Sequence, residues 1–259
     1  MRDKILILDF DGVIINGIEE YWFTCCRAYD TLLKLPLNFS YKKFKKKVPQ
    51  KFIKFRPSVT KGWEMLLLAY MIIHSDNNWD CDLLSNFENN FHLTCKSIAI
   101  KENFEEKYLQ NLLDKTRDKV IKENLDNWVS KHKLFDGIRD LLNELALRKI
   151  DFMIISSKNS KFLKHICPIF KLYPKKIFGY DNGTKISIIK KLNKKYQIIG
   201  FVEDRKEALE EIIKDNETDG IPCFFADWGY NFESDKINLN EKITILSLKT
   251  LRDLYLIFD

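Results

Sequence analysis

Glycine and proline are scarce in this chain: nine and six of its 259 residues, which excludes collagen-like and low-complexity sequences. None of the six cysteines forms a C-x-x-C pair and the four histidines are scattered, so we expect free buried thiols in a reducing compartment and no zinc site. The longest apolar run, residues 63–73, is broken by Glu64 and is shorter than the ~20 residues that cross a bilayer. We expect it to form a buried helix. With no leader pattern before the first strand, a cytoplasmic protein without a membrane partner is expected.

The composition is that of a globular protein, with 45% hydrophobic and 31% charged residues and a formal net charge of +6. The densest basic segment is the lysine-rich run 42–47. Such a run could attract nucleic acid, but no nucleic-acid-binding motif accompanies it. We therefore interpret it as the solvated face of a helix over 40–47 and expect no nucleic-acid partner.

Two carboxylates follow the first predicted strand. Residues 5–8 form an apolar run typical of a buried parallel strand, and Asp9 and Asp11 come directly after it. Residues i and i+2 of an extended chain point the same way, so both acids could face one crevice, where a divalent cation would relieve their repulsion. Gly12 lets the backbone turn sharply, so that the N–H groups after Asp9 can converge on an anion.

The rest of the chain divides into two parts. From 134 onward strands and helices alternate, which predicts a Rossmann-like parallel sheet with helices on both faces. From 16 to 133 only helical patterns occur, so we predict an all-helical domain inserted into an α/β core made of residues 1–15 and 134–259. The expected strands are 151–156, 176–178, 198–203, 222–226 and 242–246. The expected helices are 19–34, 40–47, 61–75, 80–98, 102–130, 136–148 (N-capped by Asp136), 160–167, 184–195, 205–214 and 248–258.

Three of the later predicted elements carry polar residues at one end. Ser156 and Ser157 end one strand, Lys185 opens a helix, and Glu203 and Asp204 end another strand. Together with Asp9 and Asp11, these four groups resemble the four ordered motifs of the haloacid dehalogenase-like hydrolase superfamily. A helical insertion after the first motif resembles the cap that many members carry, known as a C1 cap.

The resemblance implies a role for each motif. Asp9 would be the nucleophile that attacks phosphorus, and Asp11 the general acid and base. Ser156, helped by the backbone N–H of Ser157, would hold a phosphoryl oxygen, although Ser156 could instead cap the next helix. Lys185 would neutralise Asp9 and the phosphoryl group, with four nearby lysines as competitors: Lys175, Lys176, Lys190 and Lys191.

The fourth motif departs from the common family form. Many members have Gly-Asp and a second acid four residues later, whereas this chain has Glu203-Asp204 and then Ala208. A Glu-Asp pair resembles the branch of β-phosphoglucomutase, so Glu203 could replace the second acid. Asp9, Asp204, Glu203 and the backbone carbonyl of Asp11 would then bind Mg²⁺ as an all-oxygen set.

The resemblance implies a Mg²⁺-dependent phosphatase that hydrolyses a small phosphorylated metabolite through an aspartyl-phosphate. A phosphosugar mutase and a non-catalytic binding protein on the same fold are the alternatives. Residues 228–230, Trp-Gly-Tyr, resemble a segment of phosphoglycolate phosphatases, or are simply a packed glycine turn. Pro57 and Gly62 predict a loop that carries Arg56 and Lys61, and Arg56 suits recognition of a carboxylate or second phosphate. The sequence identifies neither the substrate, the oligomeric state nor a protein partner.

Overall fold

The computed structural model describes residues 2–74 and 81–257, the side chains of 81–89 and 256–257 excepted. The chain divides into two compact units. One comprises residues 1–16 and 133–259, and the other comprises residues 17–132.

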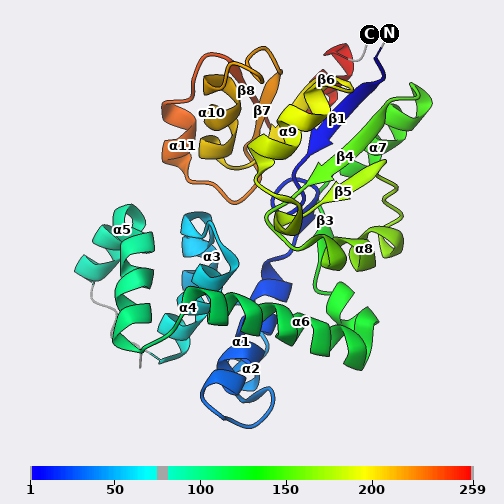
Figure 1. Ribbon diagram of the computed structural model, residues 1–259. Helices are drawn as coiled ribbons and strands as arrows, with labels where there is room; N and C mark the ends of the chain where they lie inside the picture. The colour runs from blue at the N-terminus through cyan, green and yellow to red at the C-terminus, as the bar shows by residue number, and fades with distance from the viewer. Residues whose placement is uncertain (1, 75–80, 258–259) are drawn as a thin grey trace. The chain divides into compact units, whose positions relative to one another are not determined.

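The first unit is built on a six-stranded, fully parallel sheet (Figure 1). Its strand order is β5-β4-β1-β6-β7-β8. The strands are β1 (Lys4–Leu8), β4 (Asp151–Ile155), β5 (Lys176–Phe178), β6 (Gln197–Glu203), β7 (Cys223–Ala226) and β8 (Ile243–Leu246). A separate antiparallel pair, β2 (Ile15–Asn16) with β3 (Lys133–Leu134), stands where the chain leaves this unit and returns to it.

Helices flank the sheet because its central strands are apolar on both faces and both faces must be buried. The helices are α7 (Ile138–Leu147), α8 (Ser160–Ile169), α9 (Lys185–Asn193), α10 (Lys206–Lys214) and the short α11 (Glu233–Ile237). On one face, Ile188 and Ile189 of α9 and Leu209 of α10 pack into a single core with Ile5 and Ile7 of β1. The predicted fold class, a Rossmann-like parallel sheet with helices on both faces, is confirmed.

The order of the strands locates the crevice of this fold. β1 and β6 are neighbours, but the chain leads from β1 toward β4 and from β6 toward β7, on opposite sides. Ligands of open α/β sheets bind at such a switch point, at the carboxyl ends of the strands. Leu8 of β1 lies in register with Val202 of β6 and Ile154 of β4, so the residues that follow these strands emerge side by side.

In residues 17–74 and 81–132, the second unit contains helices and no strand. It contains α1 (Ile18–Leu32), α2 (Phe39–Lys43), α3 (Gln50–Phe55), the 3-10 turn η1 (Arg56–Ser58), α4 (Gly62–His74), α5 (Cys81–Lys101) and α6 (Glu106–Val129). Residues 63–73 of α4 are all buried, which confirms the buried helix predicted for the apolar run. Within residues 2–74 and 81–257, no helix has the length and apolar character that crossing a membrane requires.

Three local predictions were wrong. The N-cap of α7 is Gly137 at φ 76°, a left-handed conformation that glycine adopts easily, and not Asp136. The lysine-rich run is helical only to Lys43, because Lys45 and Lys46 have left-handed φ values of 51° and 58°. The closing helix 248–258 is a 3-10 helix, η3 (Leu251–Ile257), and Phe258 lies outside the described residues.

Candidate active site

The loop after β1 carries the first two acids into the switch point. The N–H of Asp9 continues the sheet by donating to the carbonyl of Val202 at 2.9 Å, and both N–H groups of Ile14 and Ile15 donate to Phe10, which closes a tight turn. Gly12 lies in this turn at φ 100°, where an added Cβ would come within 2.0 Å of Oδ2 of Asp204. Glycine is required there, because the turn packs directly against the carboxylate that follows β6.

Three buried carboxylates meet at the ends of β1 and β6. Asp9, Glu203 and Asp204 each offer an oxygen within 4.8 Å of the others. Lys185, the first residue of α9, places its Nζ 2.6 Å from Oδ1 of Asp9 and also donates to Oε2 of Glu203. Thr184 N-caps α9 by accepting from the N–H of Ser187, so the helix start is fixed where the lysine projects.

Burial and mutual repulsion shift the protonation of this cluster. Burial, then the charge of Glu203, raises the pKa of Asp9 to about 7, although Lys185 opposes the shift. Burial also raises the pKa of Glu203 to about 7. Burial lowers the pKa of Lys185, but Asp9 and Glu203 outweigh it, so that this pKa lies above its ordinary value. Near neutral pH, Asp9 and Glu203 are therefore each only partly ionised, whereas Lys185 stays charged.

The donor set fits a hard divalent cation. The three carboxylates supply only oxygen, which Mg²⁺ prefers. Burial, with added repulsion from a neighbouring carboxylate, raises the pKa of Asp9 and of Glu203 to about 7, so both hold protons above their ordinary range. A cation bound among them would replace those protons.

The loop that follows β7 holds Asp204. The N–H of Tyr230 donates to Oδ2 of Asp204 at 2.6 Å, and an added Cβ on Gly229 would lie 2.2 Å from the Cβ of Asp204. Trp228 donates from Nε1 to the carbonyl of Val13, and the Tyr230 hydroxyl donates to Asn16. The Trp-Gly-Tyr segment thus packs on the Asp9 turn and on Asp204 together, which the sequence reasoning did not assign to it.

The loop after β4 places Ser156 beside this cluster of strand ends. Ser156 is buried, its N–H donates to the carbonyl of Phe178, and its Oγ accepts from the N–H of Lys158 at 3.1 Å. The N-cap of α8 is Asn159, whose side chain accepts from Lys161. The alternative that Ser156 caps α8 is therefore wrong. Ser157 is exposed on the same loop.

The structure adds a residue to which the sequence reasoning gave no role. Nζ of Lys158 lies 3.1 Å from Oδ1 of Asp11, and the two side chains are only 2% and 4% exposed. Sequence reasoning missed this residue because its partner Asp11 lies 147 positions away in the chain.

Of the four lysines that competed with Lys185, two are engaged elsewhere. Lys175 pairs with Asp151, and Lys190 lies 2.6 Å from Asp215. Lys176 and Lys191 are exposed.

Arg56 lies in the helical unit and is mostly buried. Its side chain donates to the carbonyl of Val59 at 3.3 Å, and its guanidinium stacks over the ring of Tyr21 at 4.9 Å. It belongs to the 3-10 turn η1 and not to an open loop. Its predicted contact with substrate stays a prediction.

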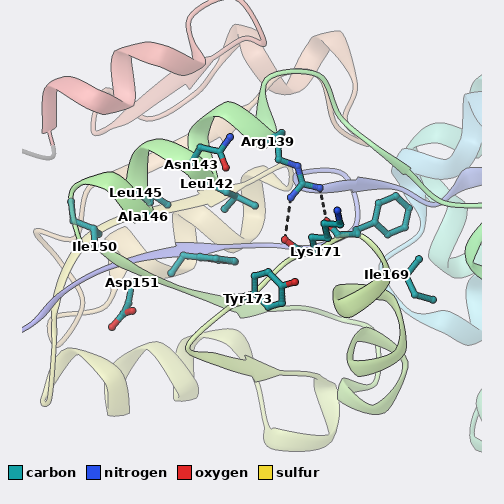
Figure 2. A pocket seen from close by; sticks show the side chains of 12 residues that line it. Arg139, Leu142, Asn143, Leu145, Ala146, Ile150, Asp151, Ile169, Lys171 and Tyr173 are labelled. Carbon is teal, nitrogen blue, oxygen red and sulfur yellow. Dashed lines mark hydrogen bonds between the residues drawn. The ribbon is translucent and has the colours of Figure 1, made fainter.

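A groove of about 780 Å³ lies elsewhere on the first unit, among α7, the start of β4 and the end of α8 (Figure 2). Arg139 crosses it and donates to the carbonyls of Phe170 and Lys171, which satisfies the C-terminal end of α8 (Figure 2). The groove is at the amino end of β4, opposite to the strand ends that carry the acids. We therefore place the candidate site at the acid cluster.

Comparisons with known proteins agree with this geometry. The family described as haloacid dehalogenase-like hydrolase matches residues 4–210. No curated protein matches the chain. One similar solved structure is a predicted phosphoglycolate phosphatase from Haemophilus somnus, with a TM-score of 0.61 at 13% identity; the match covers 98% of this chain and 99% of that chain. Another is a predicted phosphatase from Clostridium acetobutylicum, with a TM-score of 0.57 at 16% identity and 99% of each chain covered. A candidate β-phosphoglucomutase from Thermotoga maritima has a TM-score of 0.53 at 12% identity, over 97% of this chain and 98% of that chain. At these identities the similarity shows a shared fold.

Proposed function

Since the chain belongs to the haloacid dehalogenase-like hydrolase family, we propose that it is a Mg²⁺-dependent phosphatase acting on a small phosphorylated metabolite. The observation that supports this most strongly is the pairing of Asp9 with Lys185 at the switch point of the sheet, beside Glu203 and Asp204. A carboxylate nucleophile for phosphorus needs an adjacent cation, because two anions must approach each other.

The proposed reaction has two steps. A carboxylate oxygen of Asp9 attacks phosphorus, the bond to the leaving oxygen breaks, and that oxygen keeps the electron pair and takes a proton from Asp11. Asp11 then takes a proton from water, whose oxygen attacks the aspartyl-phosphate and releases inorganic phosphate and the free Asp9 carboxylate. Ser156 and the N–H of Ser157 would hold the phosphoryl oxygens, with the turn at Gly12 presenting further N–H groups.

Asp9, Asp204 and Glu203, with the backbone carbonyl of Asp11, are the groups that would hold Mg²⁺. When bound, the ion supplies neutralisation of the carboxylates and of the phosphoryl group. Lys185 would orient Asp9 through the 2.6 Å contact with Oδ1 and favour its ionised form.

We further propose that the helical unit, residues 17–132, acts as a cap that selects the substrate. Its insertion just after the acid-bearing turn supports this, because a cap there can close over bound substrate and exclude water. Arg56→Ala is expected to raise KM if Arg56 binds the substrate, and an unchanged KM would contradict that part of the proposal.

A phosphosugar mutase is the second candidate, and the Glu203-Asp204 pair and the resemblance to a candidate β-phosphoglucomutase favour it. It would use the same residues, and only the acceptor of the phosphoryl group would differ.

The test is phosphate release from a panel of phosphorylated metabolites, with Mg²⁺ and with EDTA, by the intact chain and by Asp9→Asn. We expect Mg²⁺-dependent release that the substitution abolishes. Isomerisation of a sugar phosphate without net release would favour the mutase. No turnover of any kind would contradict both and leave a non-catalytic binding protein.

A further inference from the structure

In the described part of the chain, only one of the two carboxylate oxygens of Asp11 accepts a hydrogen bond from a side chain. Its Oδ1 accepts from Nζ of Lys158, while Oδ2 is buried and finds no hydrogen-bond partner anywhere in residues 2–74 and 81–257. A buried carboxylate oxygen without a donor is costly, so the arrangement needs a physical reason. The two oxygens of this carboxyl group are therefore not equivalent in the folded chain.

The loop from 156 to 160 fixes the position of Lys158. Its N–H donates to Oγ of Ser156, and its carbonyl lies so close to Gly179 that an added Cβ there would approach it to 2.5 Å. Both the N–H and the hydroxyl of Ser160 donate to the carboxylate of Asp181 at 2.7 Å. The loop is thus braced by residues 179–181, which lie four to six residues before Lys185 in the chain.

We propose that Lys158 is a positioning residue for Asp11, and this inference rests on the proposed phosphatase function. By holding Oδ1, the ammonium fixes the rotation of the carboxyl group and leaves Oδ2 as the oxygen that exchanges a proton with the leaving group. The backbone N–H of Lys158 also donates to Oγ of Ser156 and so occupies one lone pair of that oxygen. The hydroxyl hydrogen of Ser156 is therefore directed away from the loop. One residue then orients both the proton donor and a phosphoryl ligand.

The dependence of rate on the leaving group tests this. An alkyl leaving oxygen needs the proton of Asp11, whereas p-nitrophenolate leaves without one. In Lys158→Met we expect the first-turnover cleavage of the best alkyl phosphate of the panel to slow by about 10- to 100-fold. First-turnover release of p-nitrophenol from p-nitrophenyl phosphate is expected to stay within about twofold of the intact chain, with KM unchanged in both cases.

Two further variants separate positioning from folding. Lys161→Met, three residues along the same segment and exposed, is the matched control and is expected to match the intact chain on both substrates. In the Asp11→Asn background, Lys158→Met is expected to have no additional effect, because its action passes through Asp11. Lys158→Arg, which keeps the charge, is expected to recover part of the alkyl-phosphate rate.

The outcomes are distinguishable. Equal losses on both substrates, or additive losses with Asp11→Asn, would overturn the positioning role in favour of a structural one. An intact rate on the alkyl phosphate would overturn it as well while leaving the phosphatase itself established. If the intact chain cleaves neither substrate, the proposed function fails first.

Discussion

At the residue scale, the two carboxylates that follow β1 differ in the lysine with which each forms an ion pair. Asp9 pairs with Lys185 of α9, whereas Asp11 pairs with Lys158 of the loop after β4. Burying a charge is expensive unless a partner of opposite charge is fixed beside it, so each lysine makes its acid tolerable in the interior. Because one partner comes from a helix and the other from a loop, the two acids can take different roles although only Phe10 separates them.

Gly229 provides a prediction at this scale. In Gly229→Ala the new Cβ would meet Cβ of Asp204 at 2.2 Å and the carbonyl of Gly12 at 2.6 Å, both of them groups with little room to move. Asp204 and the turn at Gly12 should separate, so we expect at least a tenfold higher Mg²⁺ concentration for half-maximal activity, that is about 1.4 kcal/mol of weakened binding. Mg²⁺ titration of phosphate release measures it.

Gly220→Ala is the control for this prediction. Its φ of 91° is also unfavourable for alanine, but an added Cβ there meets nothing within 4 Å. We expect a loss of about 1 kcal/mol of stability and no change in Mg²⁺ dependence. Equal Mg²⁺ dependence in the two variants would show that contact with Asp204 does not matter.

At the scale of elements, the strands of the first unit were predictable because their signals are local. Apolar runs such as residues 5–8 and 198–202, each ending in acids, report both a buried strand and the edge where ligands bind. The parallel order then follows from the alternation with helices. The same reasoning predicts that Asp9, Glu203 and Asp204 lie at one edge of the sheet, whereas Lys185 is predicted from the resemblance to haloacid dehalogenase-like hydrolases.

What sequence reasoning missed depends on contacts between segments distant in the chain. Lys158 meets Asp11 across 147 positions, and Tyr230 meets Asp204 across 26, so no local pattern reports either pair. Predicted helix boundaries were wrong where a turn outweighed helical periodicity. The side chains of Ser247 and Thr250 each accept a hydrogen bond from the other residue's backbone N–H, which turns the chain, so the last helix begins only at Leu251.

The helical unit depends on a buried charge network between α1 and α6. Glu20 of α1 is fully buried and accepts from Arg117 of α6 at 2.9 Å and from Trp128 at 3.1 Å. Burial lowers the pKa of Arg117, but Glu20 and Asp114 outweigh this and hold the pKa above its ordinary value. The guanidinium therefore remains charged and compensates Glu20.

Arg117→Met is expected to destabilise the chain by about 3–5 kcal/mol, because it leaves the Glu20 carboxylate buried without its cation. Urea denaturation followed by circular dichroism measures the loss. Lys115→Met, an exposed change on the same helix, serves as the control and should alter stability by less than about 0.5 kcal/mol. Similar midpoints for the two variants would mean that the network contributes no net stability.

At the scale of the whole molecule, the acid cluster should link stability to pH. Asp9 and Glu203 have folded-state pKa values of about 7, above their ordinary 3.8 and 4.5. At pH values between the ordinary and the folded-state pKa, Asp9 and Glu203 of the metal-free folded chain hold protons that the unfolded chain has released. Its unfolding free energy should therefore fall as pH rises from about 4 to about 7, by up to ~1.4 kcal/mol per pH unit for each proton.

Urea denaturation in EDTA at several pH values measures this linkage, with Glu203→Gln as the reference. The intact chain should lose stability relative to the variant as pH rises, and Mg²⁺ should restore more of it at pH 8 than at pH 5, since the cation competes with protons. Parallel pH profiles for the two chains would show that the cluster is not the source.

The most direct test of the account is to find the phosphate on Asp9. Asp11→Asn, mixed with p-nitrophenyl phosphate and Mg²⁺ and quenched in acid, should form the aspartyl-phosphate without needing a proton donor and then hydrolyse it slowly. We predict a burst of p-nitrophenol of one equivalent per chain, with a phosphoryl group on the peptide that contains Asp9 and none when Asp9 is also changed to Asn. Release of p-nitrophenol without phosphate on that peptide would contradict the account.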